Sequence, residues 1–371
     1  MINAATVSAS EALETLRAGW RAQLDGGLIA SWMLHGRPGV GKTQIIQQLA
    51  AERDAPLFDL RLTTIEPQDL RGLPYYDHET QRTIWYRPED LPDDPVRPAI
   101  LFLDELTAAS PYLQPTVYGL LQERRVGRHR IPDNVLIVAA GNMVEDGAVA
   151  YEMGTALSDR LIHMVLQASA RDWLQGYAVA HGLHPAVIAF IRTRPDLFET
   201  TEDALRRGHA IACTPRSWER VSQILRSIRD RSQRNVMIAG TVGHAAAAEF
   251  ALIADEIAAS VHVEEMLATP RHARRDLYPR TLHGLTALIY ALIALADADS
   301  LPVVIDVMAD MDSLAVGRNA GVFARLPVRE LASFGFELLI SKALDQGWEG
   351  SFAGSDSYAA YASARSDAGL T

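Results

Sequence analysis

The stretch Gly36-Arg37-Pro38-Gly39-Val40-Gly41-Lys42-Thr43 decides the fold of this 371-residue chain. It fits the pattern G-x-x-x-x-G-K-[ST], in which backbone N–H groups of a glycine-rich loop wrap around phosphates. The apolar run 30–34 precedes it and the helical pattern 44–53 follows it, which is the context that this motif requires and which argues against a chance match. The sequence therefore predicts an ATP site held by Gly36, Arg37, Pro38, Gly39, Val40, Gly41, Lys42, Thr43 and Gln44.

Lys42 is expected to reach the β- and γ-phosphates, and the Thr43 hydroxyl is expected to bind Mg²⁺. Of the 35 basic residues, only Lys42 and Lys342 are lysines. In a chain that otherwise uses arginine for positive charge, a lysine kept at position 42 indicates that arginine does not serve there.

A second apolar strand, 99–103, ends in two carboxylates, Asp104 and Glu105. Buried carboxylates are costly unless a cation partners them, and strand ends of this kind face the crevice where open α/β sheets bind ligands. Asp104 is expected to hold Mg²⁺, directly or through water, and Glu105 to orient and activate the attacking water. In isolation such a pair can instead cap a helix. After a phosphate-binding lysine, the Mg²⁺ interpretation is favoured.

Composition narrows the class of protein. Hydrophobic residues make up 48% and charged residues 22%, which is typical of a globular protein. The formal net charge of -11 argues against a general nucleic-acid binder, although it allows a locally basic channel. The single cysteine, Cys213, excludes an internal disulfide and is expected to be a small buried residue. No secretory pattern and no run long enough to span a bilayer is found, so we expect a cytoplasmic location and no membrane partner.

Strand-like and helical patterns alternate through the first half of the chain. After a helical lead-in at 1–27 and the strand before the glycine-rich turn, short buried strands are predicted at 56–62, 99–103, 135–139 and 161–166. This alternation predicts a parallel α/β sheet with helices on both faces. After about 167, helical patterns dominate, and prolines are expected at helix starts or breaks: Pro185, Pro195, Pro215 and Pro270. The tail, 350–371, is expected to be loosely ordered.

Together these motifs resemble the AAA+ superfamily and, within it, the MoxR branch, which is related to rubisco-activating, nitric-oxide-reductase-activating and gas-vesicle ATPases. Residues 31–224 carry the likeness. Segment 63–72 is similar to the branch's lead into an insert in helix 2, and 75–87 is similar to that insert, a β-hairpin. Segment 104–111 is similar to the stretch D-E-I-N-R-A-x-P, with departures at Leu106, Thr107 and Ala108, and 120–126 matches the helix before the pre-sensor hairpin.

The resemblance implies the architecture of the whole chain. We expect an AAA+ P-loop NTPase with a parallel five-stranded αβα core at 1–167, including the helix 2 insert at about 72–91. An α-helical lid follows at 168–255, and a helical C-terminal extension with a loose tail follows at 256–371. That extension resembles MoxR-type ATPases encoded beside von Willebrand A domain proteins.

The resemblance also implies roles for three polar residues. Asn142 follows a strand and resembles sensor 1, although a turn asparagine is the alternative. Arg160, in the stretch 156–161, resembles an arginine finger that reaches the γ-phosphate of the neighbouring subunit; a surface Asp–Arg pair is the alternative. Arg216, after Pro215, resembles sensor 2. A cation in the first turn of a helix opposes the dipole preference, which a phosphate partner explains better than a solvated surface arginine.

Two classes of function follow. The resemblance implies a ring, a hexamer, that uses ATP and Mg²⁺ to remodel a protein partner such as a von Willebrand A domain protein or a metalloenzyme. The acidic balance and the aromatic insert agree with it, although those aromatic residues can simply pair across the hairpin. They are Tyr75, Tyr76, Trp85 and Tyr86. The alternative is a nucleic-acid-translocating motor, which only the basic cluster 123–130 supports. A nucleotide-sensing scaffold is a third option, against which the Walker B and finger residues argue.

The pair His181 and His184 suggests a metal site only weakly. No third ligand with a standard spacing accompanies it, so a pair of loop histidines is expected instead.

Overall fold

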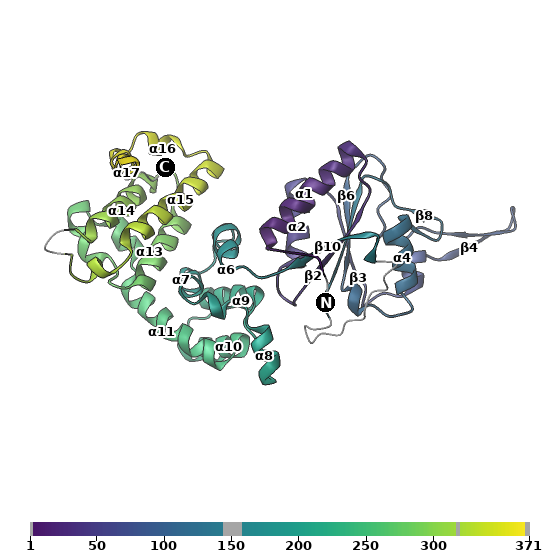
Figure 1. The fold of residues 1–371 in the computed structure, drawn as a ribbon, viewed down its shortest axis with the longest axis horizontal. Coiled ribbons are helices and arrows are strands. Elements are labelled where there is room, and N and C mark those ends of the chain that lie inside the picture. Colours follow the sequence, from purple (N-terminus) through teal and green to yellow (C-terminus); the bar gives the residue numbers. More distant parts are fainter. Residues whose placement is uncertain (1–2, 144–157, 317–319, 368–371) are drawn as a thin grey trace. The chain divides into compact units, whose positions relative to one another are not determined.

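The computed structural model describes residues 3–143, 158–316 and 320–367, which divide into two compact units (Figure 1). Unit 1 comprises Met1–Asp172, Thr200–Ala210 and Thr214–Arg216, and unit 2 comprises Trp173–Glu199, Ile211–Cys213 and Ser217–Thr371. The three-part division with boundaries at 167 and 255 stays a prediction.

In the described part of unit 1, six parallel strands form one sheet in the order β1-β10-β2-β9-β6-β3. They are β1 (Ala5–Val7), β2 (Ser31–Gly36), β3 (Leu57–Arg61), β6 (Ala99–Asp104), β9 (Val135–Gly141) and β10 (Leu161–Leu166). Strands β2, β6 and β9 are buried along their whole length, as expected of parallel strands covered on both faces. The five expected strands are all present. The sixth, β1, pairs with β10 and is only 3 residues long, too short to show a periodicity.

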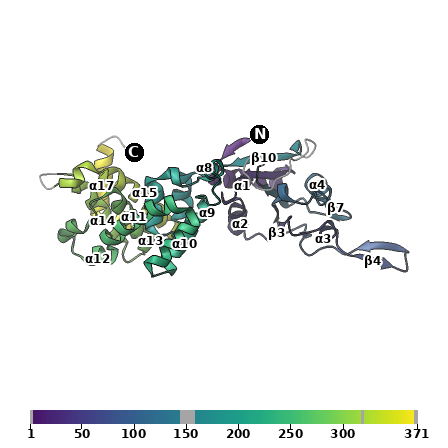
Figure 2. The same ribbon diagram turned by 90° about the horizontal axis from the view of Figure 1, so that it is seen from below.

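Helices cover both faces of this sheet (Figures 1 and 2). On one face Trp20 of α1 and Leu49 of α2 join a core cluster with Phe102 of β6, and on the other face Leu120 of α4 packs with Leu103. The expected helical lead-in is α1, which begins with a capping box at Ser8. The helices of unit 1 are α1 (Ala9–Gly26), α2 (Lys42–Glu52), α3 (Pro67–Arg71), the 3-10 turn η1 (Leu106–Ala108), α4 (Gln114–Glu123), α6 (Ala170–Asp172) and α8 (Thr201–Arg207).

Two β-hairpins extend unit 1 where the sequence predicts them. The strands β4 (Pro74–Asp77) and β5 (Arg82–Trp85) pair antiparallel, and this hairpin stands away from the sheet in both views (Figures 1 and 2). At its base, Gly72 has φ +82°, and a Cβ there would lie 1.8 Å from the carbonyl oxygen of Tyr86, so only glycine fits. The second hairpin joins β7 (Arg125–Val126) to β8 (His129–Arg130) within the basic cluster.

Unit 2 is helical, and the four prolines named from the sequence lie at helix starts or breaks as expected, with Pro215 at the junction of the two units. Pro185 and Pro215 occupy the first turns of α7 and α9, Pro195 opens a 3-10 turn, and Pro270 directly precedes another. Its helices are α7 (Pro185–Thr193), α9 (Pro215–Ser227), α10 (Arg231–Val242), α11 (His244–Ser260), α12 (Val263–Ala268), α13 (Leu282–Leu295), α14 (Leu301–Leu314), α15 (Val328–Gln346), α16 (Gly350–Ala353) and α17 (Asp356–Asp367). Shorter turns are the π-helical η3 (Trp173–Ala178) and the 3-10 turns η4 (Pro195–Leu197), η5 (Arg271–Leu277) and η6 (Gly321–Arg325).

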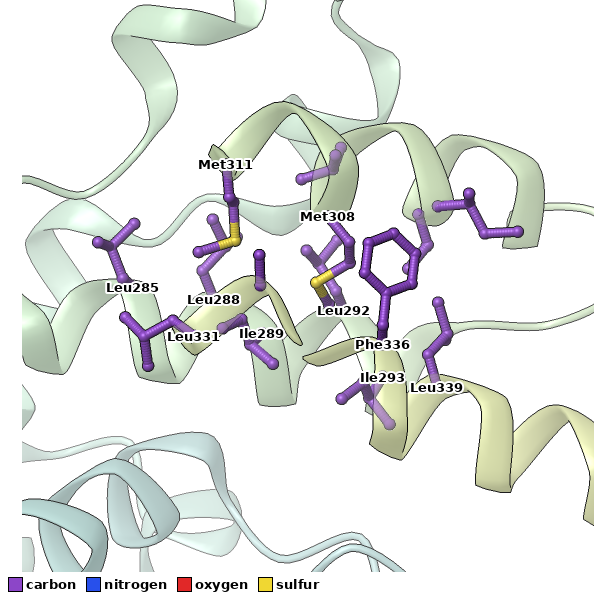
Figure 3. Packing of buried hydrophobic residues seen from close by; sticks show 14 of the residues in the cluster. Leu285, Leu288, Ile289, Leu292, Ile293, Met308, Met311, Leu331, Phe336 and Leu339 are labelled. Atoms are coloured by element: carbon purple, nitrogen blue, oxygen red, sulfur yellow. The ribbon is translucent and has the colours of Figure 1, made fainter. Parts of the chain in front are cut away.

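The core of unit 2 forms around α13 (Figure 3). This helix is apolar on all sides and buried from Gly284 to Ile293, as expected of a helix surrounded by other helices. Leu288 and Leu292 of α13 meet Met308 of α14 and Phe336 of α15. Across the described residues, no helix is both long and apolar enough to cross a membrane.

The C-terminal tail differs from the expectation of loose order. Residues 356–367 form α17, whose Tyr361 ring lies 4.2 Å from the ring of Phe336 between centroids. The tail is rich in small and polar residues, which led to the expectation of loose order. Its tyrosines Tyr358 and Tyr361 nevertheless pack on Phe336 and so attach α17 to the apolar core. Residues 368–371 lie outside the described part of the chain.

His184 makes the stability of unit 2 depend on pH. Its Nδ1 accepts a hydrogen bond from the N–H of Ala186 at the start of α7, so this nitrogen must be unprotonated. Burial, followed by the charges of Arg226 and Arg234, lowers the pKa of His184 from its ordinary 6.5 to about 4. Because the unfolded chain takes up a proton below pH 6.5 and the folded chain does so only near pH 4, stability is lost as the pH falls through this window.

We therefore expect the unfolding free energy of the unmodified protein to fall between pH 7 and pH 5 by about 2 kcal/mol more than that of His184→Asn. The asparagine keeps a hydrogen-bond acceptor at this cap but does not titrate. Urea unfolding at both pH values measures the difference. His272→Asn, at an exposed histidine of the same unit, is the control and should follow the unmodified protein. An unchanged pH dependence in His184→Asn would refute the assignment.

Candidate nucleotide site

The glycine-rich loop joins the end of β2 at Gly36 to the start of α2 at Lys42. Gly39 and Gly41 have φ angles of +79° and +107°, in the region that side chains other than glycine rarely adopt. The N-terminus of α2 has no side-chain cap, so its first N–H groups are available to an anion, which the helix dipole also attracts. This backbone fits the phosphate groups of a nucleotide.

Lys42 connects the glycine-rich loop to the end of β9. Its side chain is 9% exposed, and Nζ donates hydrogen bonds to the carbonyl oxygens of Gly36 and Arg37 and to Oδ1 of Asn142, the last at 3.0 Å. Asn142 therefore lies beside the phosphate-binding lysine, as its comparison with sensor 1 requires. The role of its amide in holding water stays a prediction.

Thr43 and Asp104 meet at the position where the sequence predicts Mg²⁺. The Thr43 hydroxyl donates to Oδ2 of Asp104 at 3.3 Å, and Oδ1 of Asp104 accepts from the N–H of Glu105 at 2.9 Å. Asp104 is 8% exposed. A hydroxyl and a buried carboxylate are hard oxygen ligands that suit Mg²⁺, so both residues fit the expected ion. Among the described residues, no group of three or more His, Cys, Asp or Glu suits a metal, so His181 and His184 are not part of such a cluster.

Glu105 follows β6 in a left-handed backbone conformation, with φ 60°. Such a conformation is uncommon for a residue with a side chain and is typical of functional sites. The Thr63 hydroxyl donates to Oε2 of Glu105, and Nε of Arg61 lies 3.9 Å from Oε1. The carboxylate of Glu105 is thus held by residues that follow or end the neighbouring strand β3.

Sequence reasoning gave no role to Arg61, Thr63 or Asp59. Arg61 pairs in register with Asp104, so its closeness to Glu105 depends on strand order, which no local pattern reveals. Burial raises the pKa of Asp59, and the charge of Asp104 raises it further while Arg61 lowers it. The carboxyl end of β3 therefore belongs to the electrostatic surroundings of the site.

Arg216 lies close to the glycine-rich loop. A Cβ added to Gly39 would lie 3.0 Å from Oγ1 of Thr214 and 3.5 Å from Cβ of Arg216, so the segment predicted to be sensor 2 packs on this turn. The Arg216 side chain is exposed. This position suits contact with a nucleotide in the same subunit, which stays a prediction.

Arg160 lies at the amino-terminal ends of the parallel strands, whereas the glycine-rich loop lies at their carboxyl ends. It directly precedes β10, whose first residue, Leu161, pairs with Ser31 at the start of β2, whereas the loop follows Gly36 at the end of β2. Six residues of strand span about 17 Å along the sheet, which is longer than an arginine side chain. Arg160 is exposed and donates a hydrogen bond to Gln122 of α4. Residues 156 and 157 of the same motif lie outside the described part of the chain.

The comparison with protein families agrees with this geometry. Residues 31–161, which run from the start of β2 to the start of β10, match the AAA domain of the dynein-related subfamily. The parallel sheet with helices on both faces that residues 31–161 form is the fold of an AAA+ P-loop ATPase domain. The matched domain supports ATP hydrolase activity, and domains of this family bind ATP, typically with Mg²⁺. No curated protein matches the sequence.

Three solved structures are distantly similar to this chain. A candidate ATPase from Cytophaga hutchinsonii has a TM-score of 0.29 and 14% identity over 64% of this chain and 86% of its own. The Thermotoga maritima RuvB Holliday junction branch migration motor has a TM-score of 0.36 and 14% identity over 65% of this chain and 67% of its own. A mutant of that RuvB has a TM-score of 0.34 and 13% identity over 91% of this chain and 89% of its own. Nothing about the substrate of this chain follows from them.

Proposed function

We propose that this chain is a ring-forming, MoxR-type ATPase that couples Mg²⁺-dependent ATP hydrolysis to the remodelling of a protein partner. The convergence of Lys42, Thr43, Asp104 and Glu105 at the carboxyl ends of β2 and β6 carries the proposal. The cytoplasm is the expected location, and a von Willebrand A domain protein is the partner class that the resemblance to the MoxR branch suggests.

The roles of the side chains follow from their charges and positions. Lys42 neutralises the β- and γ-phosphates, while Thr43 and Asp104 hold Mg²⁺, which supplies further positive charge to the phosphates. Glu105 accepts the proton of the attacking water, and Asn142 orients that water. Arg216 contacts the phosphates of its own subunit.

A ring is supported by the position of Arg160. Its guanidinium cannot reach the phosphates beside Lys42 of the same chain, because the length of β2 separates them. A second copy that places its Arg160 beside the phosphates of the first copy supplies the missing cation. Repetition of that head-to-tail contact closes a ring when the rotation between neighbouring copies allows it. The resemblance to the MoxR branch implies six copies.

The hairpin β4–β5 offers a contact surface for a protein partner. Tyr75 and Tyr86 pack against each other across the hairpin with ring centroids 5.5 Å apart. The guanidinium of Arg71 in α3 lies over the ring of Trp85, so each of these three rings has a partner within unit 1. Tyr76 makes no ring contact in the described part of the chain and is 66% exposed. An exposed tyrosine on a projecting hairpin offers a large amphipathic contact area at low entropic cost, as protein recognition commonly requires.

A cavity of about 490 Å³ lies at the base of the same hairpin. Its lining combines the apolar side chains of Leu73 and Tyr86 with three carboxylates and one cation, Arg87, whose guanidinium donates to backbone carbonyl oxygens of Leu91 and Arg130. The carboxylates are Asp69, Glu89 and Asp90. These carboxylates repel a phosphate backbone and attract basic side chains of a polypeptide. The cavity therefore supports a protein rather than a nucleic acid as the partner.

The basic cluster 123–130 gives little support to a nucleic-acid motor. Arg124 is 5% exposed and donates to the carbonyl oxygens of Pro132 and Val135, and Arg130 pairs with Asp133. Within the described residues, Arg125 and Arg128 are the members left exposed without an acidic partner. Two cations per subunit form a weak electrostatic footprint in a chain with a net charge of -11.

The proposal is tested by stimulation of ATP hydrolysis. We expect an unfolded polypeptide, reduced and carboxymethylated lactalbumin, to raise the ATPase rate, and single-stranded DNA to leave it unchanged. Tyr76→Ser should lose the stimulation but keep the basal ATPase rate and the oligomeric assembly. The phenol of Tyr76 contacts no other aromatic side chain in the described residues, so its loss should not disturb the fold of the hairpin. Tyr112→Ser, at a tyrosine that is 85% exposed elsewhere in unit 1, is the matched control and should respond like the unmodified protein.

Replacing residues 76–86 with a short Gly-Ser turn extends this test to the whole hairpin. ATP hydrolysis and assembly should survive while the response to the polypeptide disappears. Stimulation by DNA with a steep salt dependence, and none by the polypeptide, would instead favour the nucleic-acid motor.

A further inference from the structure

Two histidines contact each other inside the sheet of unit 1, on adjacent strands. His35 lies near the end of β2 and His163 lies in β10, and Nε2 of His35 is 2.8 Å from Nδ1 of His163. Their rings stack with centroids 5.2 Å apart and planes inclined by 10°. His35 is 1% exposed. A polar side chain at the depth of His35 must satisfy its hydrogen bonds or lose stability, whereas His163 is half-buried.

The carbonyl oxygen of Ser158 fixes the position of one proton of this pair. Nε2 of His163 lies 2.9 Å from the carbonyl oxygen of Ser158, which can only accept, so this nitrogen carries a proton. The second contact, between Nδ1 of His163 and Nε2 of His35, needs one donor and one acceptor. Burial, followed by the nearby His163 and Lys42, lowers the pKa of His35 to about 4, so this ring is neutral near pH 7. The two contacts connect His35 to Ser158 through His163.

These contacts join two segments that the proposed reaction needs, one at the carboxyl end of β2 and one just before the start of β10. His35 directly precedes Gly36, whose carbonyl oxygen accepts a hydrogen bond from Lys42. Ser158 lies two residues before Arg160. The histidine pair thus connects the base of the glycine-rich loop to the segment that carries the proposed finger.

We propose that His35 and His163 are positioning residues that hold the Arg160 segment in register with the glycine-rich loop of the same subunit. The inference rests on the proposed function, because it matters only if Arg160 serves the neighbouring site. Packing alone does not explain this pair. Nδ1 of His35 is buried with no hydrogen-bond partner in the described residues, and the burial of an unpaired polar atom costs free energy. An apolar pair would fill the same space without that cost.

The test uses mixed rings. His163→Phe keeps an aromatic ring and loses both hydrogen bonds, and we expect its ATPase rate to fall by about tenfold or more with unchanged ATP affinity, since small misplacements of a catalytic group have large effects on rate. If only the finger that this subunit offers is impaired, mixing it with Glu105→Gln subunits creates interfaces with an intact Glu105 and a well-placed Arg160. Hydrolysis should then recover to the same fraction as in mixtures of Arg160→Ala with Glu105→Gln.

A second variant keeps the test valid if His163→Phe fails to fold. His163→Asn is too short to reach Ser158 but still offers His35 a polar partner, so it should show the same slow, recoverable hydrolysis. Met33→Leu changes a buried residue that pairs with His163 in register and should hydrolyse ATP normally.

A normal rate in the folded His163 variants would overturn the inference. So would a slow rate that mixing does not repair, because that defect lies in the subunit's own site. If the mixture of Arg160→Ala with Glu105→Gln also stays inactive, the proposed function fails and the inference fails with it. Recovery in that mixture without recovery in the His163 mixtures refutes the inference alone.

Discussion

Arg160→Ala is expected to lower the ATPase rate by about 1,000-fold, because an arginine finger stabilises the charge that develops on the transferred phosphoryl group. The loss should appear in kcat, with little change in ATP affinity, because Arg160 lies at the end of the strands opposite to the subunit's own phosphate site. Steady-state kinetics and binding of a fluorescent ATP analogue measure the two quantities separately.

The control for this prediction is Arg21→Ala, which removes an exposed arginine from α1 of the same unit and should leave the rate unchanged. Sedimentation of both variants with ATP checks that the ring still forms. A rate for Arg160→Ala within a few-fold of the unmodified protein would show that this arginine is a surface side chain held by Gln122.

Glu105→Gln is expected to lower ATP turnover by about 100-fold or more while ATP binding persists, because the amide cannot accept the proton of the attacking water. Lys42→Ala should instead lose binding itself, since it removes the buried cation between Gly36 and Asn142. Equilibrium binding and single-turnover hydrolysis distinguish the two variants.

Glu14→Gln, at an exposed carboxylate of α1, is the control for the loss of a charge and should behave like the unmodified protein. Wild-type turnover in Glu105→Gln would show that this carboxylate does not activate water. Retained binding in Lys42→Ala would place the nucleotide elsewhere.

The parts of the fold that local sequence patterns encode were predictable. The strand β10 has the predicted bounds, and the helix after the glycine-rich loop begins two residues earlier than expected, at Lys42. These elements have strong patterns because buried parallel strands are continuously apolar and the loop motif fixes the strand–helix junction. The three-residue β1 has no such pattern, and it is stabilised by pairing with β10.

The parts of the site that depend on strand order were not predictable. Glu105 and Asp104 are adjacent in the chain and were found together, whereas Thr63 and Arg61 reach Glu105 only because β3 lies beside β6. The pair His35 and His163 is separated by 128 positions and is joined by the pairing of β2 with β10. An isolated histidine in an apolar strand carries no signal of such a partner.

The central claim is that the ATPase site is assembled from two copies of the chain, and mixing Arg160→Ala with Glu105→Gln subunits tests it most directly. Each homogeneous ring should be inactive. In an equal mixture, about one interface in four combines an intact Glu105 with an intact Arg160 from its neighbour, so hydrolysis should rise to about a quarter of the unmodified rate. Inactivity at every mixing ratio, in rings that sedimentation shows to contain both variants, would contradict the account.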